Sequence, residues 1–107
     1  MTYWFRSYWD EEDIWFYFEV ATGDWVTRQV ELQGADRTPI VAASLVESLQ
    51  ARDDGIYGAY AAAYGETAQL PVHEWVGHNP KPLTQTEFEA IWTTARHALE
   101  ARQPPRS

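Results

Sequence analysis

The chain has 107 residues, a net charge of −8 and no cysteine, so it is long enough for one domain with a hydrophobic core and lacks the side chains for disulfides or thiolate metal sites. The acidic balance opposes binding to nucleic acid and to anionic membrane surfaces, because both require basic side chains that neutralise phosphate. No apolar run approaches the roughly 20 residues that span a bilayer, and no signal-peptide pattern opens the chain, so we expect a cytoplasmic protein.

The first third of the chain predicts three antiparallel strands joined by short turns. Residues 2–9 and 14–20 are rich in aromatic and β-branched residues, and residues 25–33 alternate between polar and apolar side chains. The acidic run 10–13 and the glycine-containing stretch 21–24 separate them and are expected to form exposed turns. Together these segments predict a meander.

Alternation also predicts which strand face is buried. On the second strand we expect the core face to be the one that carries Ile14, Phe16, Phe18 and Val20. On the third strand we expect the inward residues to be Val26, Arg28, Val30 and Leu32. An inward arginine needs a charged partner, and a bulge that changes sides would let Glu19 or Glu31 serve.

The middle of the chain predicts a short strand and two short helices. A loop over 34–39 precedes the strand 40–43, and Ser44 and Glu47 have the spacing of a capping box before a helix over 45–52. Within residues 55–70 a second short helix, flanked by Gly58 and Gly65, would place Tyr57, Tyr60 and Tyr64 at helical spacing on one face.

The last third predicts an edge strand, a rigid loop and one long helix. Residues 70–76 contain a proline that suits an edge strand, and the proline-rich stretch 77–82 suits a loop. The helix begins at Thr84, with Glu87 at the capping-box position, and ends near Arg102. We therefore predict a single α+β domain over residues 1–102. It has an antiparallel sheet of three to five strands, the C-terminal helix on one face, one or two short helices in the middle, and a disordered tail over 103–107.

No catalytic, metal-binding or cofactor motif emerges from the sequence. His73 and His78 lie five residues apart, whereas the zinc-protease pattern needs histidines four apart on one helical face. The acidic run lacks the glycine and the spaced ligands of a calcium loop. We therefore expect no metal, no cofactor and no catalytic residue, although the sequence leaves enzymatic activity open.

Two groups of residues are candidates for binding. The first would line an aromatic pocket or interface, with packing in the core as the plainer interpretation: Trp15, Tyr17, Trp25, Arg28, Tyr57, Tyr60 and Tyr64. The second would form an electrostatic contact with a basic partner, with a solvated turn as the plainer interpretation: Asp10, Glu11, Glu12 and Asp13.

Two segments carry a resemblance to a known group of proteins. The strand Trp25-Val26-Thr27-Arg28-Gln29-Val30-Glu31-Leu32 and the later Leu83-Thr84, Glu87-Phe88-Glu89 and Trp92 resemble a family of small uncharacterised bacterial proteins that is common in actinobacteria. In that family an aromatic-rich hairpin precedes an R-x-V-E strand, and a final helix carries E-F-E-x-x-W. The resemblance covers the two ends of the chain and implies no activity.

The favoured interpretation is an acidic interaction module that binds a basic protein partner, as immunity or inhibitor proteins do. Negative charge, exposed acidic turns and abundant Trp and Tyr support it. One alternative is a small-molecule-binding protein or small enzyme with an aromatic-lined pocket. Another is a self-associating protein, such as a homodimer, with an open sheet face that bears Trp4, Trp15, Tyr17 and Trp25.

Overall fold

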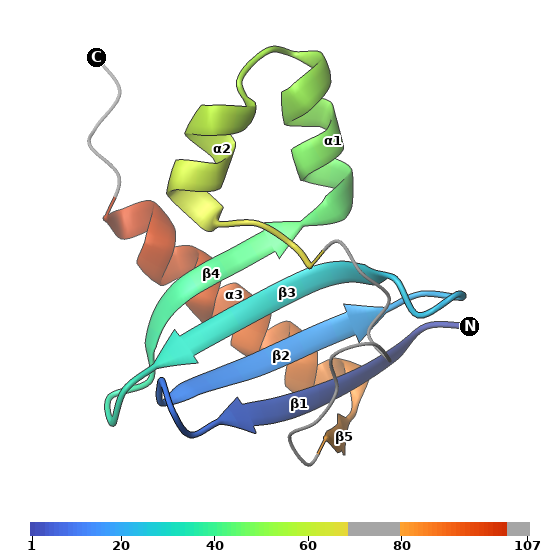
Figure 1. Ribbon diagram of the computed structural model, residues 1–107, viewed down its shortest axis with the longest axis vertical. Helices are drawn as coiled ribbons and strands as arrows, with labels where there is room; N and C mark the ends of the chain where they lie inside the picture. The colour runs from blue at the N-terminus through green and yellow to red at the C-terminus, as the bar shows by residue number, and fades with distance from the viewer. Residues whose placement is uncertain (69–79, 103–107) are drawn as a thin grey trace.

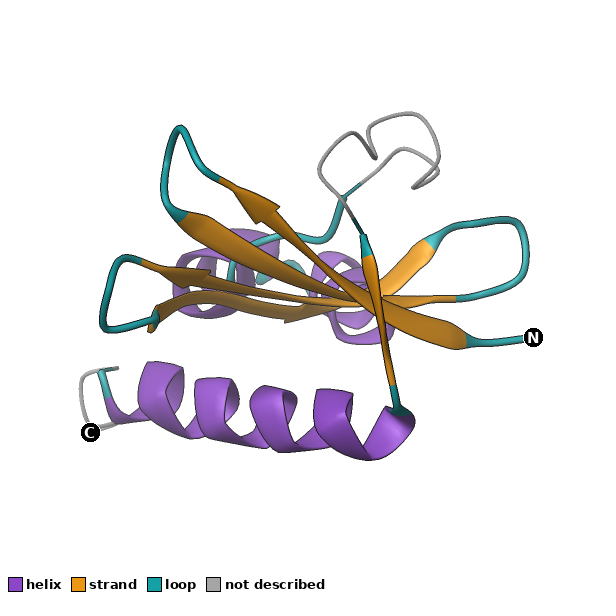
Figure 2. Cartoon of the chain, turned by 90° about the horizontal axis from the view of Figure 1, so that it is seen from below, coloured by secondary structure: helices purple, strands orange, loops and turns teal. Residues whose placement is uncertain are grey.

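A five-stranded antiparallel sheet and a long helix on one of its faces form the two layers of the fold (Figures 1 and 2). The computed structural model describes residues 1–68 and 80–102. In the order β4-β3-β2-β1-β5, the strands are β1 Tyr3–Trp9, β2 Ile14–Val20, β3 Val26–Gln33, β4 Thr38–Ser44 and β5 Lys81–Leu83. The helices are α1 Leu45–Asp53, α2 Tyr57–Tyr64 and α3 Gln85–Ala101. The predicted α+β fold, its N-terminal meander and its helices are confirmed.

Two segments differ from the predicted boundaries. The fourth strand is longer than residues 40–43, because Thr38 and Pro39 pair with β3. Lys81 and Pro82, which were expected in a loop, form β5 together with Leu83 and pair with β1. The predicted strand over 70–76, His73, His78 and the tail 103–107 lie outside the described residues.

The main core lies between the sheet and α3 (Figure 2). Tyr17 and Val30 are direct neighbours on β2 and β3, and they pack with Phe88, Ala95 and Leu99 of the helix. α3 therefore covers the Trp15/Tyr17 face of β2. The expectation that the Phe16/Phe18 face is the core face was incomplete, because period-2 alternation separates two faces but does not say which one a helix will cover.

The opposite face of the sheet buries a second apolar cluster. It consists of Phe5, Phe18, Val20 and Val26. Val26 joins this cluster, and not the α3 side with Val30, because the register between β2 and β3 shifts between Glu19 and Val20. Such a bulge moves the residues beyond it to the other face, which corrects the predicted inward side of Val26.

The face proposed for self-association is covered. Trp4 and Trp15 pack against the cluster beneath α3, and Tyr17 is part of it. Trp25 precedes β3 and lines a separate cavity beside α1. The four aromatic residues therefore do not form the expected open patch.

Both hydrogen bonds of the capping box predicted at the start of α3 are present. The Thr84 hydroxyl accepts from the Glu87 backbone N–H at 3.1 Å, and the Glu87 carboxylate accepts from the Thr84 N–H at 2.9 Å. These bonds satisfy two donors that a helix start otherwise leaves unpaired. Of the helices in the described ranges, none is long and apolar enough to cross a bilayer.

Candidate functional site

Arg28 lies between two carboxylates beneath α3. Its guanidinium contacts Glu19 on the neighbouring strand at 2.6 Å and Glu89 on the helix at 2.7 Å. It also lies 5.0 Å from the ring centroids of both Phe88 and Trp92. Glu19 faces Arg28 directly in the β2–β3 register, so the predicted ion pair forms without Glu19 changing sides. With both flanks of the guanidinium occupied, Arg28 links β2 and β3 to α3 through charged contacts.

The pKa values of this cluster follow from its contacts. Burial alone would raise the pKa of Glu19, but hydrogen bonds from Arg28, Trp4 and Thr27 outweigh it and hold the pKa below its ordinary value. Burial opposes the charge of Arg28 in the same way, and its bonds to Glu19 and Glu89 outweigh it and raise its pKa. The cluster is therefore charged and internally satisfied at neutral pH.

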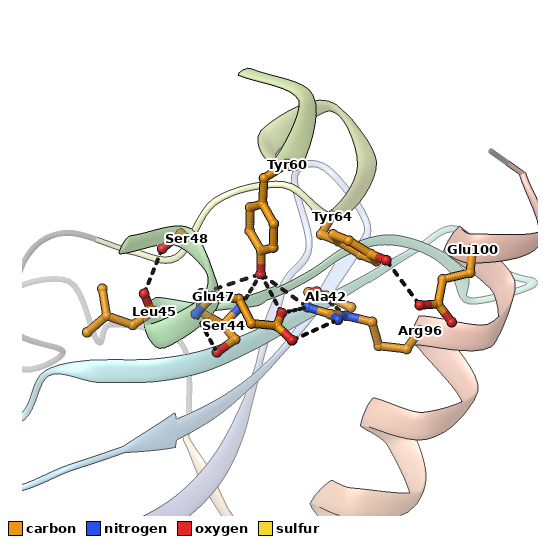
Figure 3. A network of polar contacts seen from close by, with 9 residues as sticks. All are labelled: Ala42, Ser44, Leu45, Glu47, Ser48, Tyr60, Tyr64, Arg96 and Glu100. Atoms are coloured by element: carbon orange, nitrogen blue, oxygen red, sulfur yellow. Dashed lines mark hydrogen bonds and ion pairs between the residues drawn. The ribbon is translucent and has the colours of Figure 1, made fainter. Parts of the chain in front are cut away.

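A second polar network joins α1, α2 and α3 to β4 (Figure 3). The Tyr60 hydroxyl accepts from the Ser44 backbone N–H at 2.8 Å and donates to Glu47 at 2.8 Å. Arg96 donates to Glu47 and, at 2.8 Å, to the carbonyl of Ala42. The Glu47 carboxylate thus binds Arg96 and Tyr60. A full capping box would require this carboxylate to accept from the Ser44 N–H, which instead donates to Tyr60. The other half of the predicted box is present, because the Ser44 hydroxyl accepts from the Glu47 N–H at 3.4 Å.

The three tyrosines of α2 do not line one pocket. Tyr60 and Tyr64 pack together, with ring centroids 5.2 Å apart, beside the Arg96 guanidinium. Tyr57 instead donates to Glu66 and lies under Arg52, 4.7 Å from the ring centroid. The helix is only eight residues long, and its first and last turns belong to different surroundings.

A cavity of about 200 Å³ lies where β3 begins and β4 passes into α1. Its apolar walls include Trp25, Leu45 and Leu49, and its polar walls include Arg52 and Tyr57. Of the aromatic residues that we singled out from the sequence, this cavity brings together two, Trp25 and Tyr57. The volume is below the roughly 300–1,000 Å³ of drug-sized ligand sites, so it fits a single side chain or a very small molecule.

Large exposed apolar side chains accompany this cavity. Trp25 is 46% exposed and Leu49 48% exposed, and both belong to its wall. Val46, 74% exposed, lies on α1, and Ile56, 55% exposed, lies between α1 and α2; neither is part of the cavity wall. Single exposed apolar residues are ordinary, but an exposed Trp beside a hollow is typical of a contact surface.

The acidic turn lies at the other end of the strands, between β1 and β2 (Figure 1). Asp10, Glu11 and Glu12 are exposed, whereas Asp13 is half-buried and accepts from the Tyr8 hydroxyl at 2.7 Å. Within residues 1–68 and 80–102, no three acidic, histidine or cysteine side chains come close enough together to hold a metal ion.

Sequence reasoning did not select Arg52, Leu49 or Arg96. Arg96 lies one helical turn after Trp92, on the side of α3 that faces the sheet, and such an arginine needs partners just as Arg28 does. Arg52 and Leu49 join the cavity only because α1 folds back beside Trp25, a contact that no local pattern encodes.

Comparison of the chain with known proteins finds no matching family model, no similar curated protein and no similar solved structure. The resemblance to the actinobacterial family therefore stays a prediction, and function has to be argued from the surface of the molecule itself.

Proposed function

We propose that the protein is a binding module for a basic protein partner, of the inhibitor or immunity type. The observation that carries the proposal is which acidic side chains form ion pairs within the fold and which remain exposed. Arg28 forms ion pairs with Glu19 and Glu89, and Arg96 forms an ion pair with Glu47. The carboxylates that remain on the surface include Asp10, Glu11, Glu12, Asp36, Asp53, Asp54, Glu66 and Glu100.

Tyrosine hydroxyl groups fix several of the carboxylates in place. Five of the six tyrosines donate to an acidic side chain, in the pairs Tyr3–Asp24, Tyr8–Asp13, Tyr57–Glu66, Tyr60–Glu47 and Tyr64–Glu100. A phenol orients a carboxylate without cancelling its charge, and a pre-oriented charge costs less side-chain entropy when a partner binds.

Tyr8, Tyr57 and Tyr60 stay protonated at neutral pH because their contacts raise the pKa of each phenol. Hydrogen bonds to Asp13 and Glu66 raise the pKa of Tyr8 and of Tyr57, and burial together with Glu47 raises the pKa of Tyr60 to about 12. The tyrosines therefore serve as donors that hold negative charge in position, which favours electrostatic recognition over chemistry at these groups.

Affinity capture from a lysate of the organism that carries the gene tests the proposal. We expect a basic protein to be retained at about 0.05 M salt and released at about 0.3 M, because the screening length falls to less than half over this range. Two variants with the same loss of charge locate the contact: D10N/E11Q/E12Q at the acidic turn, and D53N/D54N/E66Q beside α1. Retention that neither variant weakens and salt does not alter would refute a basic partner.

A further inference from the structure

We propose that the cavity beside Trp25 is the docking site of the partner. It receives one large apolar side chain from a partner segment in which lysine or arginine residues flank that side chain. The inference rests on the proposed function and adds the place and the chemistry of the contact. It is argued from the shape of the cavity, from its lining residues and from the charges around it.

The cavity has the size of one side chain and an apolar mouth. Its volume is about 200 Å³, and Trp25 and Leu49 on its wall are each nearly half exposed. Contact with an inserted apolar group would remove both side chains from water, at about 25 cal/mol for each Å² that is covered. An apolar occupant also buries its own apolar surface, whereas a charged group would lose hydration on entering, so we expect an apolar occupant.

The lining also has the residue types that dominate protein interfaces. Trp, Tyr and Arg are the side chains most enriched among energetically dominant contacts, and Trp25, Tyr57 and Arg52 all line this cavity. Arg52 and Tyr57 are already ordered, because the guanidinium stacks on the ring and the Tyr57 hydroxyl donates to Glu66. A wall that is ordered before binding loses little entropy when a partner arrives.

Acidic residues adjoin this lining in the sequence and set the charge of the partner. Asp53 and Asp54 follow Arg52, and Glu66 accepts from Tyr57 and precedes the buried Thr67; all three carboxylates are exposed and outnumber the positive charge of Arg52 on the wall. Lysine or arginine residues on either side of the inserted group would meet these carboxylates, whereas an acidic segment would be repelled. Charge complementarity therefore favours a basic protein segment over a free anionic metabolite.

Short synthetic peptides test this inference with defined probes. The series has the form Lys-Lys-Ala-X-Ala-Lys-Lys with X as Phe, Leu or Ala, and a matched series replaces every Lys by Glu. Binding is followed by NMR through the indole N–H of Trp25 and the methyl groups of Leu49. We expect the basic Phe and Leu peptides to shift these signals and to bind at least about tenfold more tightly than the basic Ala peptide.

Single substitutions on the cavity wall, with a matched control elsewhere on α1, locate the contact. Leu49→Ala should weaken binding of the basic Phe peptide by about tenfold, and Trp25→Ala should do the same. Val46→Ala removes a more exposed apolar side chain from the same helix but not from the cavity wall, so it should leave binding unchanged. Thermal unfolding of each variant verifies that the fold is intact.

Four results would overturn the inference, and they differ in what they say about the proposed function. If all basic peptides bind equally and the acidic ones do not, charge recognition stands and the side-chain pocket fails. If acidic Phe peptides bind as well as basic ones, the basic partner fails too. Binding of free indole as tightly as the basic Phe peptide would indicate a small-molecule site, and signal shifts that depend on protein concentration without peptide would indicate a second copy of the chain.

Discussion

Glu31 occupies the side of β3 that faces away from α3, where we expected an exposed residue. It is half-buried between neighbours on β2 and β4, Phe16 and Val41, and it accepts from the Gln29 amide at 2.7 Å. Burial raises the pKa of this carboxyl above its ordinary value, and the amide bond offsets only part of that effect. The folded protein therefore holds a proton on Glu31 more tightly than the unfolded chain does.

Replacement of this carboxyl by an amide should make the protein more stable at neutral pH. Because the folded-state pKa is raised, stability is lost as pH rises from the unfolded-state value, near 4.3, through the folded-state value. Glu31→Gln removes this loss, so its unfolding free energy should exceed that of the parent at pH 7 and approach it below about pH 4. Urea titrations at both pH values measure the difference. The exposed Glu12→Gln is the control, and an equal gain in that variant would point to net charge and not to burial.

Arg28 shows which contacts of a residue can be predicted from the sequence and which cannot. A charged residue among apolar ones requires a partner, and that requirement is met by Glu19. The second partner, Glu89, lies 61 positions further along the chain on another element. Its identity depends on where α3 crosses the sheet, which is set by packing and not by any local pattern.

At the scale of elements, β4 is an edge strand whose free backbone groups are occupied from outside. Tyr60 binds the Ser44 N–H, Arg96 binds the Ala42 carbonyl, and Arg102 binds the Pro39 carbonyl at 2.6 Å. Pro39 itself has no N–H to offer. Gly65, at φ +83°, ends α2 close to Val41, where a Cβ would come within 2.7 Å of a methyl group. These contacts fasten the helices to the strand and close its edge to further pairing.

Tyr60→Phe should therefore cost more stability than Tyr64→Phe. The first change leaves the Ser44 N–H and Glu47 without their phenol partner in a half-buried site, at a cost of about 1–3 kcal/mol. The second change removes a bond to the exposed Glu100 and should alter the unfolding free energy by less than about 0.5 kcal/mol. Chemical denaturation of both variants makes the comparison, and equal losses would show that Tyr60 does not hold α2 on β4.

The elements themselves were largely predictable, and their partners were not. Alternation, turns and the Thr84 cap identified β1, β2, β3 and α3 closely, because each depends on residues a few positions apart. Pairing of residues 81–83 with β1 was missed because a three-residue segment with Pro82 at its centre carries no strand signal. The cavity beside Trp25 was missed for a similar reason, since its walls come from three separate parts of the chain.

At the scale of the whole molecule, a net charge of −8 on a chain of this size makes the folded state repel itself. Sodium chloride should therefore raise the urea midpoint between about 0.01 M and 0.15 M, as the screening length falls from about 30 Å to about 8 Å. The variant D10N/E11Q/E12Q, with a net charge of −8 + 3 = −5, should respond less to salt. A midpoint that falls with salt in both proteins would mean that the ion pairs of Arg28 and Arg96 outweigh the repulsion.

The edge strands of the sheet also affect how the surface around Leu49 and Asp53 can change during evolution. Side chains bind backbone groups of Ala42 and Ser44 on β4, and β5 is a three-residue strand with Lys81 and Pro82, features that disfavour pairing with a visiting strand at either edge. Recognition then depends on side chains such as those of Leu49 and Asp53, which carry little of the core. Substitutions at exposed positions of this kind usually change stability by less than about 0.5 kcal/mol. Under the function that we propose, successive substitutions at such positions would change which partner is recognised while the framework that presents them stays unchanged.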